Sequence, residues 1–226
     1  MRALYSQFVQ AGDLVFDIGA HVGDRTAAFR ALGCRVVAVE PQPHVHRLLR
    51  LLFARDGEVK LIRAAVSDTP GRLTLHINTA NPTVSTASPE FLAAAGAGAV
   101  GWHDQNWDAA TEVEAVTLDA LIGAHGAPSF VKIDVEGLED RVLAGLSTPV
   151  RALSFEFTTL QRDVALRALA RLDALGGYLF NAALGESHAM TFAHPQSGTE
   201  IAAWLRDLPD DANSGDVYAV QHIQGT

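Results

Sequence analysis

The sequence contains a single cysteine, Cys34, among its 226 residues. One cysteine excludes an intrachain disulfide and a zinc site built from cysteines, because both need more than one thiol. Basic residues are also scarce: 17 Lys and Arg stand against 26 Asp and Glu, so the formal net charge is −9. This balance argues against nucleic acid and against an anionic membrane as partners, because both bind clustered Lys and Arg.

Long hydrophobic runs are absent too. No window approaches the roughly 18 consecutive apolar residues of a membrane-spanning helix, and the first residues lack the apolar run of a signal peptide. The sequence therefore predicts a cytoplasmic protein. Its 48% hydrophobic and 19% charged residues are ordinary globular values. Its length predicts a single domain over residues 1–226 with one substantial core.

Short β-branched runs alternate with helical patterns in the first third of the chain. Strands are expected over three ranges, 14–18, 35–40 and 59–65, and helices over 22–32 and 44–54. The second of these helices places four apolar residues on one face: Val45, Leu48, Leu49 and Leu52. Strand–helix units of this length imply parallel pairing with right-handed crossovers.

The middle of the chain interrupts this alternation. Residues 72–77 alternate like a half-exposed strand, and residues 79–111 are rich in Ala, Gly, Asn and Ser, with a short helix expected over 89–95. We expect an insertion over about 70–117, either a lid over a ligand or a packed structural insert. Four of its residues could form an aromatic substrate wall or pack against the core: Trp102, His103, Asp104 and Trp107.

The strand–helix pattern then resumes. Strands are expected over 111–117, 129–134, 152–157, 178–180 and 217–220, with helices over 118–124, from 137, over 162–175 and over 200–205. The predicted fold class is α/β: a doubly wound, Rossmann-like, mostly parallel seven-stranded sheet with helices on both faces. The insertion falls between the third and fourth core strands.

Ligands of such sheets bind outside the carboxyl ends of the strands, and polar residues mark those ends. The first strand runs into Asp17, Gly19 and Gly23, a spacing that does not match the G-x-G-x-x-G dinucleotide fingerprint. Asp17 suits a positively charged ligand group, and Glu40, at the end of the next strand, could accept both hydroxyls of a ribose. The alternatives are a structural turn for the two glycines and a helix N-cap for Asp17.

The fourth core strand ends in a second polar group. Asp134 and Lys132 share one side of the strand by its period of two, and Glu136 follows directly. A carboxylate at the end of a buried strand needs a partner or a function. Lys132 is the candidate partner.

Five blocks of sequence, in this order and spacing, resemble the FkbM family of class I S-adenosylmethionine-dependent methyltransferases. The blocks are residues 15–23, 39–41, 64–68, 116–121 and 131–139. The resemblance implies S-adenosyl-L-methionine as cofactor and O-methylation of a hydroxyl on a small molecule, such as a sugar or polyketide-like metabolite. The alternatives are a non-catalytic S-adenosylmethionine-binding module and an NAD-linked oxidoreductase or epimerase. The oligomeric state, a homo-oligomer included, stays open.

The resemblance also implies roles for individual residues. The cofactor-binding residues would be Asp17, Gly19, His21, Gly23, Glu40, Pro41, Ala65, Val66 and Asp134. The catalytic residues would be Asp134, Lys132 and Glu136.

No metal is expected. Asp134, Glu136 and Glu156 could converge as hard oxygen ligands. However, the fifth core strand ends Glu156-Phe-Thr, without the Asp-Asn pair that magnesium-dependent small-molecule methyltransferases carry there.

Overall fold

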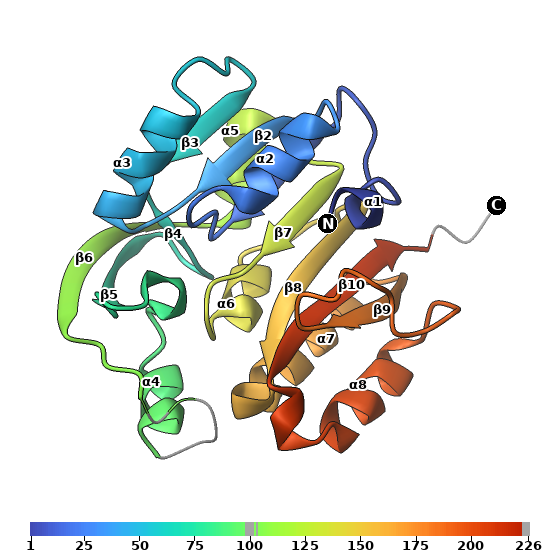
Figure 1. Ribbon diagram of the computed structural model, residues 1–226. Coiled ribbons are helices and arrows are strands. Elements are labelled where there is room, and N and C mark those ends of the chain that lie inside the picture. The colour runs from blue at the N-terminus through green and yellow to red at the C-terminus, as the bar shows by residue number, and fades with distance from the viewer. Residues whose placement is uncertain (98–101, 103, 223–226) are drawn as a thin grey trace.

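A central seven-stranded sheet organises the chain, seen in a computed structural model that describes residues 1–97, 102 and 104–222 (Figure 1). The strand order is β3-β2-β1-β7-β8-β10-β9. The strands are β1 (Leu14–Ile18), β2 (Arg35–Val39), β3 (Val59–Ile62), β7 (Phe130–Ile133), β8 (Ala152–Thr158), β9 (Tyr178–Leu184) and β10 (Ser214–Gln221). All neighbours from β3 to β8 pair in parallel, and β10 runs antiparallel to both β8 and β9. The predicted fold class is confirmed.

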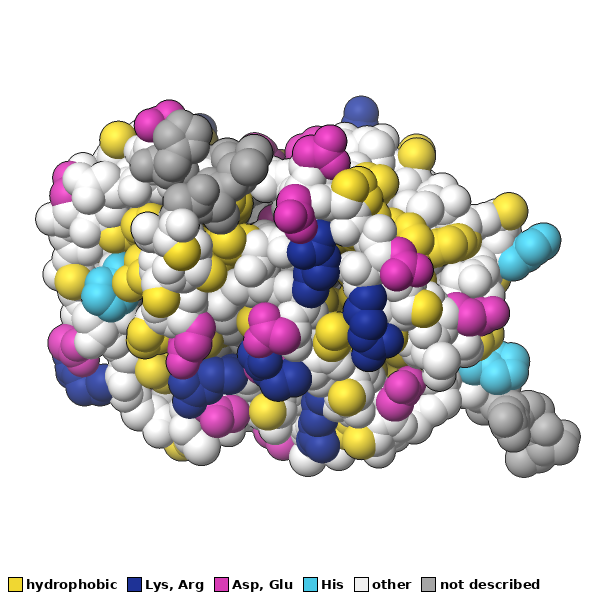
Figure 2. Space-filling model, turned by 90° about the horizontal axis from the view of Figure 1, so that it is seen from below, with side chains coloured by type: hydrophobic (Ala, Val, Ile, Leu, Met, Phe, Trp, Pro, Cys, Tyr) yellow, Lys and Arg dark blue, Asp and Glu magenta, His cyan; other side chains and the backbone are white. Residues whose placement is uncertain are grey.

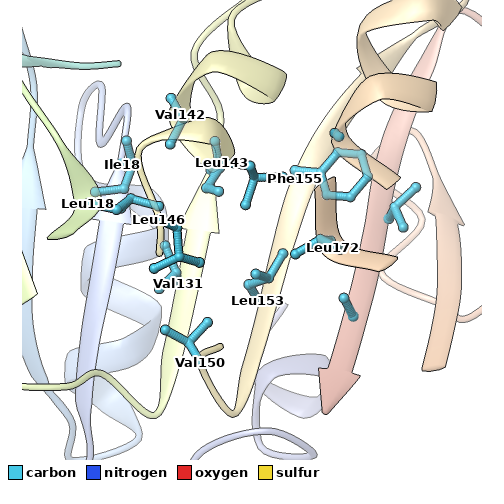
Figure 3. Close-up of a cluster of buried hydrophobic side chains, with 14 of the residues drawn as sticks. Ile18, Leu118, Val131, Val142, Leu143, Leu146, Val150, Leu153, Phe155 and Leu172 are labelled. Carbon is cyan, nitrogen blue, oxygen red and sulfur yellow. The ribbon is translucent and has the colours of Figure 1, made fainter. Parts of the chain in front are cut away.

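Helices cover both faces of this sheet. One face carries α1 (Arg2–Tyr5), α2 (Asp24–Ala31) and α3 (Pro43–Leu52), and the other carries α5 (Leu118–His125), α6 (Glu139–Ala144), α7 (Arg162–Leu175) and α8 (Gly198–Asp207). Strand side chains alternate between the faces: Phe16 packs under α5–α8, while Val15 packs under α1–α3. Figure 3 shows the first of these cores, where Val131 and Leu153 of the sheet meet Leu143 of α6.

A second, three-stranded sheet forms in the middle of the chain. It has the order β4-β6-β5, with β4 (Ala65–Val66) parallel and β5 (Gly71–Ile77) antiparallel to β6 (Ala109–Val116). The strand predicted over 111–117 is β6, which lies in this second sheet and outside the central sheet, within the expected insertion of about 70–117. Only alternate residues of β6 are buried, which suits a strand with one solvated face rather than a strand inside the central sheet.

Two short helices separate β5 from β6: the 3-10 helix η1 (Pro82–Val84) and the α-helix α4 (Pro89–Gly96). Figure 1 shows the small sheet and α4 beside the carboxyl ends of β2 and β7. Two further 3-10 helices lie later in the chain: η2 (Thr159–Gln161) and η3 (Asp210–Ala212). Among the described residues, no helix is long and apolar enough to cross a membrane.

Helix α3 differs from its predicted packing. Of the four apolar residues expected on one face, only Leu49 is fully buried, whereas Leu48 is 40% and Leu52 is 58% exposed. The reason is its position: α3 packs against β3, the edge strand, so the sheet covers only a narrow stripe of the helix.

Candidate active site

A cavity of about 370 Å³ lies at the carboxyl ends of β1, β2 and β7, where doubly wound sheets bind ligands. Its volume falls within the usual range of small-molecule sites. Most of the predicted site residues line it: Asp17, Gly19, His21, Glu40, Pro41, Ala65, Val66, Asp134 and Glu136. Gly23 and Lys132 do not. The topology therefore brings together four separate stretches of the sequence that were predicted to share one site.

The two glycines after β1 do different work. Gly19 has a positive φ of 81°, and a Cβ atom there would lie 1.7 Å from the carbonyl oxygen of Asp134, so only glycine lets the two loops meet. Gly23, with φ of 89°, packs instead against Phe53 and Leu49 beneath α3. For Gly23 the structure therefore favours the structural turn over cofactor contact.

Glu40 follows β2 and is only 2% exposed. Its Oε2 accepts a hydrogen bond from the backbone N–H of His21 (2.9 Å), and its Oε1 accepts one from the N–H of Gln42 (2.7 Å). Burial raises the pKa of Glu40 to about 7. Each carboxylate oxygen keeps a further lone pair, so the site fits a ligand that donates two hydroxyl groups.

Asp17 is buried at the end of β1, with 1% exposure. Its Oδ2 accepts a 2.5 Å hydrogen bond from the hydroxyl of Thr26 in α2. Burial raises the pKa of Asp17 to about 6. Asp17 thus lines the cavity while the Thr26 hydroxyl holds its carboxyl group in place. It is not the N-cap of α2, because that position is Gly23.

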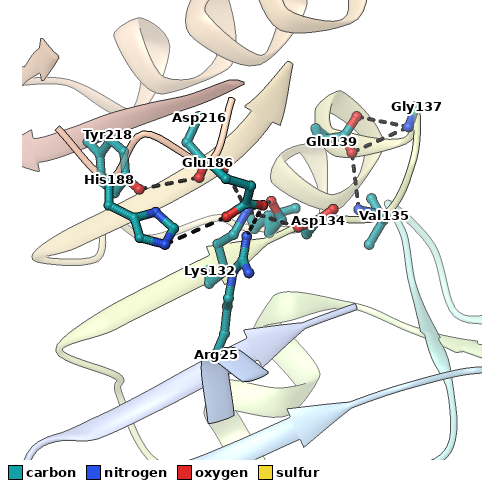
Figure 4. A network of polar contacts seen from close by, with 11 residues as sticks. Arg25, Lys132, Asp134, Val135, Gly137, Glu139, Glu186, His188, Asp216 and Tyr218 are labelled. Atoms are coloured by element: carbon teal, nitrogen blue, oxygen red, sulfur yellow. Dashed lines mark hydrogen bonds and ion pairs between the residues drawn. The ribbon is translucent and has the colours of Figure 1, made fainter. Parts of the chain in front are cut away.

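Lys132 and Asp134 form the ion pair that the sequence predicted (Figure 4). The Nζ atom of fully buried Lys132 lies 3.3 Å from Oδ2 of Asp134 and 2.7 Å from Oδ1 of Asp216 on β10. Burial alone would lower the pKa of Lys132, but the two carboxylates outweigh it and raise that pKa. Burial alone would likewise raise the pKa of Asp134, but Lys132 and Arg25 outweigh it and hold that pKa below its usual value. Asp134 is therefore ionised at neutral pH.

Two more carboxyl groups lie beside Asp134. One oxygen from each of Asp134, Glu136 and Glu156 lies within 4.8 Å of the other two. Burial, followed by the nearby charge of Asp134, raises the pKa of both glutamates well above the usual value. Such a group can share protons or hold a hard cation. The absence of a metal stays a prediction from the sequence.

The loop that carries Glu136 is held by hydrogen bonds between its backbone groups and two side chains, those of Thr86 and Glu139. Glu136 has a positive φ of 56°, and its carbonyl oxygen accepts a 2.6 Å hydrogen bond from the hydroxyl of Thr86. Glu139, which is 3% exposed, accepts hydrogen bonds from the N–H groups of Val135 and Gly137, each at 3.1 Å. Strained backbone held in this way is common at functional sites.

Arg25, Glu186 and Glu156 line the cavity but were not predicted to bind the cofactor or to take part in catalysis. Arg25 of α2 is the one Lys or Arg among the described residues that line the cavity, and its Nη2 lies 2.7 Å from Oε1 of Glu186, which also lines it. Glu156 was considered only as a metal ligand. Glu156 could have been predicted, because it is an acidic residue near the end of a buried strand. No local sequence pattern indicates Arg25 or Glu186.

The tryptophans of the middle segment pack within that segment. Trp102 and Trp107 meet the ring of fully buried Phe91 edge-on, with centroids 5.0 and 6.2 Å apart, and Trp107 Nε1 donates to the carbonyl oxygen of Val84. None of these rings lines the cavity. Both tryptophans therefore pack within the protein and do not form an aromatic substrate wall. His103 lies outside the described residues.

Comparisons with known proteins agree with this geometry. The family model described as the methyltransferase FkbM domain matches residues 17–208. Hexuronic acid methyltransferase AglP of Haloferax volcanii is 24% identical over 163 residues, which are 71% of this chain and 61% of AglP. The chain thus spans about three fifths of the length of that curated relative.

A solved structure shares the fold at low sequence identity. A putative rRNA methylase from Clostridium thermocellum superposes with a TM-score of 0.50 at 11% identity, covering 99% of this chain and 94% of that one. For precorrin-6y C5,15-methyltransferase from Geobacter metallireducens GS-15, the TM-score is 0.48 at 14% sequence identity, and the match covers 97% of this chain and 87% of that one. The match to the family model covers most of the chain and agrees with the family and the cofactor that the sequence motifs predicted. The chain belongs to the FkbM family of S-adenosylmethionine-dependent methyltransferases.

Proposed function

We propose that this protein methylates a hydroxyl oxygen of a small molecule, such as a sugar or a polyketide-like metabolite. The observation that carries the proposal is the ionised carboxylate of Asp134, which borders the same cavity as Glu40. The curated relative's name, a hexuronic acid methyltransferase, supports a sugar-like acceptor.

The residues around Glu40 fit the cofactor. Glu40 would hold the ribose hydroxyls, and Pro41, Ala65 and Val66 offer an apolar wall for a planar ring in the same cavity. Gly19 lets the loop after β1 meet the loop after β7, because a Cβ atom there would collide with the carbonyl oxygen of Asp134. When bound, S-adenosylmethionine supplies the methyl group that is transferred.

Asp134 would orient the acceptor hydroxyl and accept its proton. Most of the rate of methyl transfer comes from alignment of the reacting atoms, and a positioned base adds about 10²–10⁴-fold. Lys132 does not line the cavity, so it acts as a positioning residue that keeps Asp134 ionised. Burial and the charge of Asp134 raise the pKa of Glu136 and Glu156, which favours their protonated forms, and a protonated carboxyl group can donate a hydrogen bond to an acceptor oxygen.

A transfer assay tests the proposal. The protein is incubated with methyl-labelled S-adenosylmethionine and separate panels of neutral sugars, uronic acids, amines and hydroxylated polyketides. We expect label on a hydroxyl oxygen, located by mass spectrometry of the product. Binding of the cofactor without transfer to any panel would support the non-catalytic module instead, and transfer only to nitrogen would contradict O-methylation.

A further inference from the structure

Helix α3 presents several leucine side chains to solvent. Leu48 is 40% exposed, Leu51 is 73% exposed and Leu52 is 58% exposed. Among the described residues, only Leu184 and Val220 are other large hydrophobic residues of comparable exposure. Three neighbouring leucines in water are therefore a local feature of this helix.

Arginines surround these leucines. Arg47, Arg50 and Arg55 are all exposed, and none of them forms an ion pair with another described residue. We call the three leucines and the three arginines the α3 surface. It lies at the outer edge of the molecule, beside β3 (Figure 1).

The charge of this region is opposite to that of the whole chain. Residues 43–63 contain five Lys and Arg against two Asp and Glu, a net charge of +3, in a chain of net charge −9. One of the two acids, Asp56, is already paired with Arg30 at 2.7 Å. The average charge of the chain thus conceals a local concentration of positive charge.

Several arginines elsewhere form ion pairs with carboxylates. Figure 2 shows Lys and Arg side chains interleaved with Asp and Glu side chains on the face seen from below. Arg141 pairs with Asp68 at 2.9 Å, and Arg167 pairs with Asp140 at 2.6 Å. Arg47, Arg50 and Arg55 are therefore available to an external anion, whereas Arg141 and Arg167 are already paired.

We propose that the α3 surface docks on an anionic phospholipid membrane. A helix with leucines flanked by arginines can lie in the plane of a bilayer, with its apolar side chains below the headgroups and its cations among the phosphates. Anionic lipids attract such cations by about 1 kcal/mol for each Lys or Arg near the surface. The net charge of the whole chain argues against a membrane partner, but binding depends on the local charge of the surface that meets the lipid.

Charge complementarity favours a membrane over a second copy of the chain. In a symmetric dimer the same patch would meet itself. Arg47, Arg50 and Arg55 would then face the same three cations of the other copy, and like charges facing one another are destabilising. A dense array of phosphates satisfies those cations instead.

The experiment is co-sedimentation of the full chain with phosphatidylcholine vesicles, with and without phosphatidylglycerol. We expect binding to the anionic vesicles only, and a decline as salt is raised because exposed charges are screened. The double variant Arg47→Gln/Arg50→Gln should weaken partitioning by about 25-fold, about fivefold for each charge. The double variant Leu51→Ser/Leu52→Ser should also lose binding.

Matched controls are available in the same chain. Leu184→Ser changes an exposed leucine and Arg167→Gln changes an exposed arginine, both outside α3, and both variants should bind like the wild type. Circular dichroism should show unchanged folding for all four variants because every altered side chain is exposed. Equal binding to neutral vesicles, no binding to anionic vesicles, or a dimer that the α3 variants dissociate would each overturn the proposal.

Discussion

Lys132 and Asp134 lie 3.3 Å apart, yet only Asp134 borders the cavity. The cation is thus enclosed behind the acid that it keeps ionised. A ligand in the cavity meets the carboxylate and not the ammonium. This arrangement separates the residue proposed to touch the acceptor from the residue that sets its charge.

Replacing the acid tests its proposed role. Asp134→Asn should leave the fold and most of the affinity for S-adenosylhomocysteine intact, while turnover falls by about 10²–10⁴-fold. Thermal unfolding, calorimetry and the methyl-transfer rate on an aliphatic alcohol measure the three quantities. If the melting temperature fell while the rate per folded molecule stayed unchanged, Asp134 would be a structural residue only.

Replacing the cation separates positioning from chemistry. Lys132→Met leaves the carboxylates of Asp134 and Asp216 without their shared partner, and breaking a buried pair on one side destabilises a protein by about 3–5 kcal/mol. Because the pKa of Asp134 should then rise, the acid limb of the pH–rate profile should move to higher pH. Asp216→Asn is the matched control, since Asp134 keeps its cation. An unshifted profile in Lys132→Met would contradict the positioning role.

The affinity for the cofactor should depend on Glu40. Glu40→Ala should weaken binding of S-adenosylhomocysteine by about 1–3 kcal/mol, because hydrogen bonds to a charged acceptor are lost. Calorimetry measures the change, with NAD as the competing ligand. NAD binding as tight as that of S-adenosylhomocysteine would instead support the oxidoreductase alternative.

Glu40 should also make stability depend on pH. Burial raises its pKa to about 7 in the folded chain, from the ordinary 4.5. The folded state therefore binds this proton more tightly, and the stabilisation is complete below about pH 4.5 and lost as pH rises through about 7. Between pH 5 and 8, the wild type should lose about 2.5 kcal/mol more unfolding free energy than Glu40→Gln. Parallel denaturant curves for the two proteins would show that Glu40 does not titrate in this range.

The middle segment is tested by hydrogen exchange. If residues 79–111 close over the acceptor, their amides should exchange rapidly in the free protein and become protected once cofactor and acceptor bind. The amides of β7 serve as the internal control, because that strand is buried in the central sheet. Strong protection of 79–111 without ligands would favour a packed insert.

The sequence by itself determined the sheet, the strand ends and most of the cavity lining. Buried strands and glycine turns can be predicted from neighbouring residues in the sequence. The run from Val15 to Gly23 predicts a strand followed by a turn with positive φ angles, and the structure has both. Once parallel strands are inferred, their carboxyl ends must meet, which places Glu40 and Asp134 together.

Only the tertiary structure decided which of these residues face the ligand and which face the protein. Lys132 and Asp134 share one side of a strand, but β10 closes over Lys132 by bringing Asp216 against it, 84 positions away in the chain. The Arg25–Glu186 pair spans 161 positions, and no local pattern encodes it. The same holds for α3, whose apolar spacing predicted burial. Its leucines stay exposed because the sheet ends at β3, and where a sheet ends depends on every strand pairing at once.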